Sequence, residues 1–410
     1  MKKLYLLLDE WDNDRNFVGG ELEVLCRKYE VEVICNSAVS DLDERIKYHI
    51  YKKPSKLYAI SSLIRGLIDK DLWNELSNAV HYNSDTHSTL SFRISEAVRF
   101  YINADLFRRF MNKQGCFENG VIYYSYWNFW KCYAVTHEMN KYPDSRAISR
   151  IHGYELYDEQ IPSGYQPFKN IMADKLDKLI FVSETGRDHY FAKFKKIDDA
   201  RYGLYQLGTV NVMTDDEKAL SVSCHHHGEF LLVSCSRIDK IKRVGLIADA
   251  LSLIDDVKIR WIHFGSGLLE DEVKAGAERL LNDKENISFD FKGFVENNVI
   301  HGFYGNHHPD AFINVSSSEG NPVSVMEALS YGIPVIAPAI CNFPNMIQDC
   351  GILVSGECRA DELAETIRKF AGMPDEDIVR MRNNARRCWE EKFDADKNNR
   401  RFVEEVFDRL

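Results

Sequence analysis

The chain of 410 residues is long enough for two or three domains, and its 45% hydrophobic residues are enough for each domain to bury a core. A peptide, a disulfide-stabilised mini-protein and a largely disordered chain are thereby excluded. The formal net charge of -11 argues against non-specific binding to nucleic acid, which depends on clustered Lys and Arg.

The N-terminal sequence MKKLYLLLDE predicts a first β-strand, because its apolar run over residues 4–8 is shorter than the roughly 7 to 15 residues of a signal peptide. No apolar run approaches the ~18 residues of a membrane span. The ten cysteines are spread along the chain without a C-x-x-C pair, as is typical of reduced thiols. We therefore expect a cytoplasmic protein whose membrane contact would be peripheral, at the inner face of the cytoplasmic membrane.

Short apolar runs alternate with stretches of helical period in the first half of the chain, which predicts βα units around a parallel sheet. The clearest predicted helices span residues 88–112 and 184–195. The polar, aperiodic residues 207–228 are interpreted as a linker. The predicted strands of the first half are KLYLLL, VEVIC, IKYHIY, VIYYSY, AISRI and KLIFVS.

A second series of strands follows the linker, and residues 375–410 predict two more helices with a break near Phe393. The sequence therefore predicts two doubly wound α/β domains, residues 1–212 and 213–393, with residues 394–410 packing back on the first. Ligands of such domains bind beyond the carboxyl ends of the parallel strands. The strands of the second series are EFLLVSCS, VKIRWIHF, ISFDFKG, DAFINVS, IPVIAP and GILVS.

The segment VSSSEGNPVSVMEALSYGIPVIAP is the most informative one. It predicts a helix over residues 323–331 directly after a strand, with Pro322 at the first helical position. Free N–H groups at Asn321 and residues 323–325, together with the helix dipole, would favour a phosphate or a sugar hydroxyl. Glu319 lies before this helix, and Glu327 lies inside it, where it can accept hydrogen bonds from a vicinal diol. The alternative is a solvated helix face with one helix-start carboxylate.

The residues EGNPVSVMEALSYGIPVIA resemble the E-x7-E signature of family 4 of the retaining GT-B glycosyltransferases. The resemblance implies a GT-B fold: two Rossmann-like domains that face each other across a cleft, an acceptor-side N-terminal domain and a donor-binding C-terminal domain. It implies that Glu319 lines the donor-sugar pocket and that Glu327 holds the ribose. It also implies that the backbone after Glu319 contacts the sugar and the phosphates, at Gly320, Asn321, Pro322 and Val323.

Two further segments match the same family. In SRIDKIKRV, Arg237 and Lys242 resemble the Arg and Lys that clamp the donor diphosphate, whose negative charge grows as it leaves. In SRIHGYELYDE, His152 follows a strand as the family histidine does, and it would position the donor sugar. Without the resemblance, the basic residues would be interpreted as exposed charges and His152 as a structural hydrogen-bonding residue.

Three glycines and one valine complete the expected donor-binding set. Gly19 and Gly20, in NFVGGELEVL, are expected at a helix start, where the glycine pair of relatives lets the backbone approach the donor phosphate and the acceptor. The alternative is an ordinary tight turn, which would use the same glycines. Gly265 follows the strand in WIHFGSG, and Val295, in FKGFV, is expected to border the nucleobase. The chain departs from many relatives after VIAP, where CNFPNMI stands in place of a Gly-Gly loop and a Glu.

We expect neither a metal ion nor a cofactor, because the nucleotide-sugar is itself a substrate. Four D-x-D pairs are interpreted as solvated charges, since none of them ends an apolar strand. The consecutive His225, His226 and His227 are a polar run, because neighbouring side chains point in different directions. The four pairs are Asp41/Asp43, Asp69/Asp71, Asp375/Asp377 and Asp394/Asp396.

The resemblance thus implies a hexosyl-type retaining glycosyltransferase of class EC 2.4 that acts on a nucleotide-sugar, most simply a UDP-sugar. The acceptor would be a saccharide or a lipid-linked saccharide in cell-surface polysaccharide or glycoconjugate biosynthesis. Residues 88–113 are basic and aromatic, and we expect this helix to contact anionic lipid, the alternative being an ordinary amphipathic helix. Two other functions stay open: a sugar-nucleotide epimerase of similar fold, and an inactive nucleotide-binding subunit of a glycosyltransferase complex.

Overall fold

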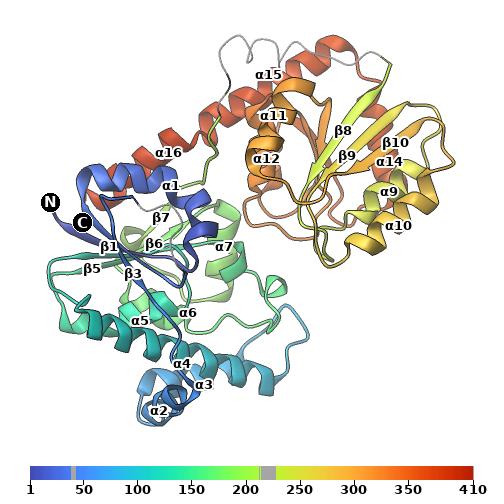
Figure 1. Ribbon diagram of the computed structural model, residues 1–410. Coiled ribbons are helices and arrows are strands. Elements are labelled where there is room, and N and C mark those ends of the chain that lie inside the picture. Colours follow the sequence, from blue (N-terminus) through green and yellow to red (C-terminus); the bar gives the residue numbers. More distant parts are fainter. Residues whose placement is uncertain (38–42, 212, 214–227, 410) are drawn as a thin grey trace. The chain divides into compact units, whose positions relative to one another are not determined.

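The computed structural model describes residues 1–37, 43–211, 213 and 228–409 (Figure 1). The chain forms two compact units, which are described separately: Met1–Gln206 together with Asp396–Leu410, and Leu207–Ala395. The chain thus leaves the N-terminal unit a few residues before position 212, and its last helix returns to that unit. Most of residues 207–228 and all of His225, His226 and His227 lie outside the described residues.

The N-terminal unit is built on a seven-stranded parallel sheet in the order β3-β2-β1-β4-β5-β6-β7. The six strands predicted for this half are all present. β7 was missed, because it has only three residues and none of them is fully buried. The strands are β1 (Lys3–Leu7), β2 (Glu30–Cys35), β3 (Lys47–Ile50), β4 (Ile122–Ser125), β5 (Arg146–Ile151), β6 (Lys178–Phe181) and β7 (Tyr202–Leu204).

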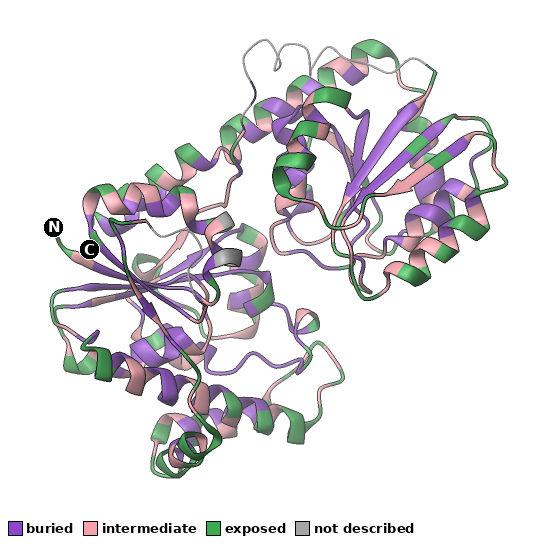
Figure 2. Cartoon of the chain, viewed as in Figure 1, coloured by how far each residue is buried: buried purple, intermediate pink, exposed green. Residues whose placement is uncertain are grey.

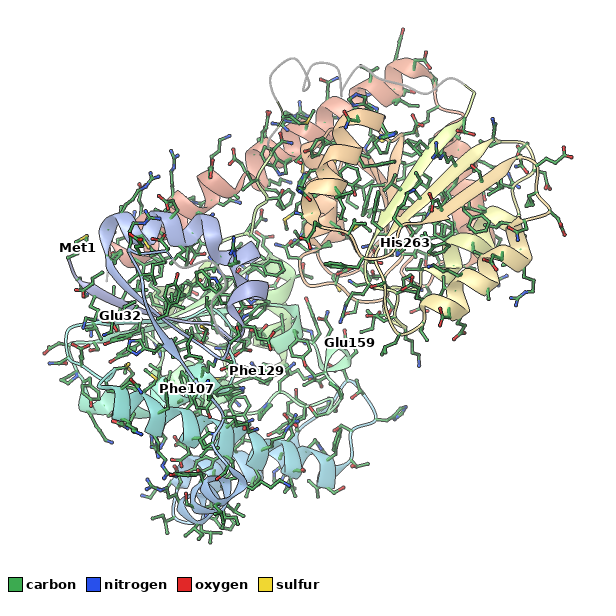
Figure 3. The ribbon with its side chains drawn as sticks, viewed as in Figure 1. Met1, Glu32, Phe107, Phe129, Glu159 and His263 are labelled. Atoms are coloured by element: carbon green, nitrogen blue, oxygen red, sulfur yellow. The ribbon has the colours of Figure 1, made fainter. Side chains whose placement is uncertain are left out.

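Helices cover both faces of this sheet. Aromatic side chains of α4 and α5 pack on one face, among them Phe107, which Figure 3 labels. α1 and the C-terminal segment, with Phe402 and Phe407, pack on the other face. The helices are α1 (Trp11–Lys28), α2 (Lys56–Gly66), α3 (Lys70–His81), α4 (Leu90–Gln114), α5 (Trp130–Glu138), α6 (Lys169–Lys175), α7 (Glu184–Lys193) and α16 (Ala395–Phe402), which a π-helical turn, Val403–Phe407, extends.

The expectation that Gly19 and Gly20 stand at a helix start is wrong, because α1 begins at Trp11 and both glycines lie in its interior. The early start has a local cause: the Asp14 carboxylate accepts hydrogen bonds from the N–H groups of Asp9 (2.7 Å) and Glu10 (3.2 Å). A Cβ at Gly20 would lie 2.7 Å from Nδ2 of Asn399, whereas one at Gly19 would meet open space. Gly20 therefore permits close approach of the C-terminal helix.

The C-terminal unit is built on a six-stranded parallel sheet in the order β10-β9-β8-β11-β12-β13, and all six of its strands were predicted. The strands are β8 (Phe230–Cys235), β9 (Ile259–Phe264), β10 (Ile287–Phe291), β11 (Ala311–Ile313), β12 (Val335–Pro338) and β13 (Gly351–Val354). The helices are α9 (Gly245–Ser252), α10 (Glu270–Leu281), α11 (Asn297–His307), α12 (Val323–Ser330), α13 (Phe343–Ile347), α14 (Ala360–Ala371) and α15 (Asp375–Lys392).

Both sheets are buried between their helices, as the strands in Figure 2 show. Burial on both faces explains why the strands are near-continuous apolar runs and not alternating ones. The two units have the two-domain, Rossmann-like α/β architecture of the GT-B fold, as predicted. Among the described residues, no helix is both long and apolar enough to cross a lipid bilayer.

Candidate functional site

The carboxyl ends of β8, β9 and β11 meet at one edge of the C-terminal sheet, because all its strands are parallel. Backbone hydrogen bonds hold the loops there together. The N–H of Ser317, after β11, donates to the carbonyl of Ile241, after β8, over 2.8 Å. The N–H of Ile238 donates to the carbonyl of Ser266, after β9, over 3.0 Å. Three loops distant in sequence thus form one surface.

Lys242 and Glu319 are brought together at this edge, as the sequence predicted for two residues of one site. The Lys242 ammonium lies 2.6 Å from Oε1 of Glu319, and most of both side chains is buried. A turn fixes the lysine, since Oδ1 of Asp239 accepts hydrogen bonds from the N–H groups of Ile241 and Lys242, both at 3.0 Å. A cation is therefore held beside the start of α12.

The Glu319 carboxylate is also fixed by the loop that carries it. Its Oε1 accepts hydrogen bonds from the hydroxyl of Ser316 (2.7 Å) and from Nδ2 of Asn314 (3.1 Å). Three donors on one oxygen give the Glu319 carboxylate a defined position. They also compensate for its burial, since only 7% of the residue is exposed. Ser316 and Asn314 were not predicted as site residues, although the polar residues at the end of the strand DAFINVS indicate a site at this position.

Arg237 lies in the same loop as Lys242 but faces solvent. Its side chain is 78% exposed and forms an ion pair with Asp239 at 3.2 Å. A neighbouring arginine, Arg243, was not predicted as a site residue, and it is less exposed than Arg237. Nε of Arg243 donates to the carbonyl of Val315 over 2.6 Å, and Arg243 has a positive φ of 50°. Arg243 thereby joins the loop after β8 to the loop after β11.

The start of α12 differs by one residue from the prediction. Pro322 is the N-cap and not the first helical residue, and its carbonyl accepts a hydrogen bond from the N–H of Val325 over 3.1 Å. The N–H of Val325 is therefore used inside the protein, contrary to expectation. The N–H groups of Val323 and Ser324 stand at the open N-terminal end of the helix, where the helix dipole favours an anion. Gly320 and Asn321 precede this end, beside Glu319.

Glu327 lies inside α12 and is 7% exposed. Burial raises its pKa to about 7, although a hydrogen bond from Nδ2 of Asn297 over 3.0 Å acts to lower it. Nε2 of His301, also in α11, lies 4.0 Å from the carboxylate. A buried carboxylate with so few donors has unused acceptor capacity, which suits a ligand that carries hydroxyl groups.

Gly265 and His263 shape the end of β9. Gly265 has a φ of 130°, and a Cβ there would lie 1.9 Å from the carbonyl oxygen of Ser236, so only glycine fits. His263, labelled in Figure 3, is fully buried, and its Nδ1 is 2.8 Å from the Ser234 hydroxyl. Burial lowers the pKa of His263 to about 4, so its ring is neutral. The partly buried Val295 follows β10 and packs against the apolar core.

His152 belongs to the N-terminal unit, directly after β5. It is 8% exposed, and its ring lies against the rings of Trp127 (4.5 Å between centroids) and Tyr126 (5.0 Å). Its Nδ1 is 3.7 Å from Oε1 of Glu155, which is too long for a hydrogen bond. Neither ring nitrogen has a hydrogen-bond partner among the described residues, and both nitrogens are buried from solvent.

One group of possible metal ligands occurs among the described residues, formed by Asp69, Asp71 and His137 in the N-terminal unit. The interpretation of Asp69 and Asp71 as solvated charges is wrong. Oδ2 of Asp69 accepts hydrogen bonds from Tyr101 (2.8 Å) and His137 (3.1 Å), and Asp71 pairs with the Lys175 ammonium at 2.7 Å. Since protein donors already occupy these carboxylates, we assign the group a structural role.

The N-terminal unit also contains a cavity of about 460 Å³ between α3, α6 and α7. Its volume is within the ~300–1,000 Å³ typical of small-molecule sites. Tyr82 and Phe194 supply aromatic walls, and Lys193 at its edge is neutralised by Asp85 and Asp158. The cavity is also lined by four residues with amide side chains, Asn78, Asn83, Gln166 and Asn170.

Comparisons with known proteins agree with this architecture. Residues 215–388 match the family model described as Glycosyl transferases group 1. No curated protein sequence matches the chain. A solved sucrose-phosphate synthase from Thermosynechococcus elongatus is similar over 100% of both chains, with a TM-score of 0.68 and 13% identity.

Two other solved structures are similar over 100% of both chains, each with a TM-score of 0.64. They are Anabaena HepE in complex with UDP and glucose, at 15% identity, and the lipopolysaccharide outer core galactosyltransferase WaaB, at 14% identity. At such identities the likeness shows the fold. The family match covers the candidate site at the carboxyl edge of the C-terminal sheet.

Proposed function

We propose that the chain is a retaining hexosyl-type glycosyltransferase of class EC 2.4, because residues 215–388 match the family model described as Glycosyl transferases group 1. The donor is a nucleotide-sugar, for which we propose a UDP-sugar. The observation that carries the proposal is the Lys242–Glu319 pair of 2.6 Å beside the N-terminus of α12. This arrangement offers a cation and backbone donors to a diphosphate, and a carboxylate to a sugar.

In the proposed mechanism the bond between the anomeric carbon and the phosphate oxygen breaks, and its electron pair stays on the diphosphate. The acceptor hydroxyl attacks the same face of the sugar, and its proton passes to the leaving phosphate oxygen. Lys242, Arg237 and the N–H groups of Val323 and Ser324 stabilise the negative charge that develops. These groups supply the positive charge without a metal ion. Glu319 binds the donor sugar and stabilises the cationic sugar in the transition state.

The nucleotide half of the donor is assigned to Glu327 and the loops around it. The unused oxygen sites of the Glu327 carboxylate would accept hydrogen bonds from the two ribose hydroxyls. Gly265 and Val295 lie at the ends of β9 and β10, where the nucleobase would fit. The similar HepE structure contains UDP, which supports the choice of uridine for the first experiment.

For the acceptor we propose a saccharide, free or lipid-linked, in the biosynthesis of a cell-surface polysaccharide or glycoconjugate. The cavity in the N-terminal unit supports this choice, because amide groups and aromatic rings are the groups that bind sugars. His152, with its two unpaired ring nitrogens, is assigned to binding the hydroxyls of the donor sugar. The acceptor-side role of the N-terminal unit follows from the cavity.

A donor screen tests the proposal and separates it from its two alternatives. The full chain is incubated with UDP-, GDP- and ADP-sugars with and without saccharide acceptors, and the products are identified by mass spectrometry and NMR. A new α-glycosidic bond from an α-linked donor supports the proposal. Conversion of the sugar-nucleotide without an acceptor would indicate an epimerase. Nucleotide binding without hydrolysis or transfer by any donor would indicate an inactive subunit.

A further inference from the structure

Helix α2 packs on the N-terminal unit with its small residues, not with its apolar ones. Ser62 and Gly66 are its buried residues, and the Ser62 hydroxyl donates to Oδ2 of Asp105 in α4 over 2.7 Å. A Cβ at Gly66 would lie 2.7 Å from Leu72 and 3.0 Å from Tyr101, so only glycine permits this contact. These residues are spaced by one helical turn and define the inward face of α2.

The outward face of α2 is apolar. Every large apolar side chain of residues 57–68 is exposed, up to 76% at Leu57 and 86% at Ile68, and Figure 2 shows α2 as largely exposed. Soluble proteins rarely expose contiguous apolar patches of this kind unless a partner covers them. The exposed residues are Leu57, Tyr58, Ile60, Leu63, Ile64, Leu67 and Ile68.

A tryptophan extends this apolar face. Trp73, in α3, is 56% exposed, and its Nε1 donates to the carbonyl of Leu67 over 2.9 Å, which holds the indole beside the end of α2. A tryptophan with a satisfied N–H and an exposed ring is typical of the boundary between water and lipid. We define the α2 surface as the exposed apolar side chains of residues 57–68 together with Trp73.

The α2 surface is bordered by positive charge in an otherwise acidic protein. Residues 52–68 contain four basic side chains and no Asp or Glu, whereas the whole chain has a net charge of -11. All four are exposed, and none has an ion pair with a described residue. The next carboxylates along the chain, Asp69 and Asp71, are engaged by protein donors, and so is Asp105, which contacts Ser62. The four basic residues are Lys52, Lys53, Lys56 and Arg65.

Helix α4, for which lipid contact was expected, fully or partly buries most of its large apolar side chains. Its Phe100, Tyr101 and Phe107 are buried in the core. Its basic residues are also used within the unit: Arg108 pairs with Glu138 at 3.1 Å, and Arg109 donates to Ser61 over 2.7 Å. Exposed large apolar side chains of α4 are confined to its first turns, at Leu90, Phe92 and Ile94, and lipid contact by residues 88–113 stays a prediction.

We propose that the α2 surface docks the protein on a lipid bilayer that contains anionic lipids. The apolar side chains would enter the boundary between headgroups and acyl chains, and the lysines and Arg65 would contact the anionic headgroups. In a symmetric dimer this basic border would face a second basic border, and the repulsion between them favours an anionic bilayer over a second copy of the chain. The proposal adds to the proposed function a membrane at which a lipid-linked acceptor would lie. Only this link to the acceptor rests on the proposed function; membrane binding itself does not.

Vesicle flotation of the full chain tests the proposal without donor or acceptor, so its outcome is independent of enzymatic activity. The vesicles contain phosphatidylcholine alone or about 30% phosphatidylglycerol. We expect flotation with the anionic vesicles and its loss at high salt. Ile64→Glu should abolish flotation, and Lys52→Glu with Lys53→Glu should weaken it about fivefold per charge. The matched control is Leu268→Glu, which changes a leucine of the C-terminal unit that is even more exposed than Ile64, 97% against 62%.

Two results would overturn the proposal. The first is a wild-type protein that stays in the soluble fraction with both vesicle types. The second is a stable dimer that Ile64→Glu converts to a monomer, measured by light scattering, because a second copy would then cover the α2 surface. Since all substituted side chains are exposed, unchanged far-UV circular dichroism and thermal midpoints are expected and show that the variants fold.

Discussion

The Lys242 ammonium contacts Oε1 of Glu319 over 2.6 Å at the carboxyl edge of the C-terminal sheet. The pair joins the loop after β8 to the loop before α12. Without ligand, each residue neutralises the other. A bound nucleotide-sugar would instead place its phosphates beside the lysine and its sugar beside the glutamate, so the pair is built to be shared with a ligand.

Replacement of the lysine tests this view. Lys242→Ala should lower kcat by about 10²–10³-fold, because it removes a positive charge from the position where the diphosphate leaves. Steady-state kinetics with the donor found in the screen measures the effect. Lys240→Ala is the matched control, since it removes an exposed lysine from the same loop, and it should stay within about threefold of the wild type. Equal effects of the two variants would remove Lys242 from the mechanism.

Glu327 predicts a pH dependence of nucleotide binding. Its pKa of about 7 means that the carboxylate is half protonated near neutral pH and loses acceptor capacity below it. The affinity for UDP should therefore fall as the pH decreases from about 8 to 6. Glu327→Gln should bind UDP more weakly at every pH and should lose this dependence. A pH profile that is identical in both proteins would show that Glu327 does not contact the nucleotide.

The raised pKa of Glu327 also makes the stability of the fold depend on pH. Because the folded-state pKa is raised above its usual value of 4.5, the protonated form stabilises the fold, and this contribution is lost as the pH rises through about 7. At pH ~8, Glu327→Gln should thus be more stable than the wild type, by up to roughly 3 kcal/mol. At pH ~5 the difference should shrink. Chemical denaturation at the two values measures it, and a less stable variant at the higher pH would contradict the prediction.

Substitution of Gly265 should strongly destabilise the C-terminal unit. A methyl group at this position would overlap the carbonyl of Ser236, and the φ of 130° is strained for any side chain. Gly265→Ala should destabilise the C-terminal unit by at least ~2 kcal/mol. Gly276→Ala is the control, because it lies in α10 with no atom within 4 Å and should gain up to ~1 kcal/mol in helix stability. Thermal unfolding that ranks the variants in reverse would refute this account of the loop.

The two glycines of α1 allow a test of their corrected position. Gly19→Ala should stabilise the protein by up to ~1 kcal/mol, because Gly19 faces open space inside a helix. Gly20→Ala should gain less, since it must displace the Asn399 amide. Neither change should alter the affinity for UDP in a calorimetric titration. A tenfold weaker affinity for UDP in either variant would indicate that these glycines belong to the donor site.

Much of the fold follows from local sequence. Most of the twelve predicted strands are buried apolar runs bounded by polar loops, and the break between α15 and α16 lies where residues 393 and 394 interrupt the helical period. The position of Glu319, Gly320 and Pro322 between β11 and α12 was predictable, because an apolar strand precedes them and a stretch of helical period follows. A one-residue error at Pro322 remained, since its proline φ fits an N-cap and a first helical position alike.

Other features depend on tertiary packing and could not be predicted. The sequence of α2 shows an apolar face, but the period does not tell which face points inward, and here Ser62 and Gly66 do. The arginines of one loop are alike in sequence, yet Arg237 is exposed and Arg243 binds backbone carbonyls. Such differences arise from contacts between segments that are far apart in the chain.

Calorimetric titration of the full chain with UDP tests the central claim most directly, namely that the surface formed by Lys242, Glu319 and Glu327 binds the donor nucleotide. We predict one site, with affinity reduced about tenfold or more by Lys242→Ala and by Glu327→Gln, since each removes a hydrogen bond to a charged group worth ~1.5–3 kcal/mol. Lys240→Ala should bind as the wild type does. Absence of UDP binding, or equal affinity in all four proteins, would contradict the account.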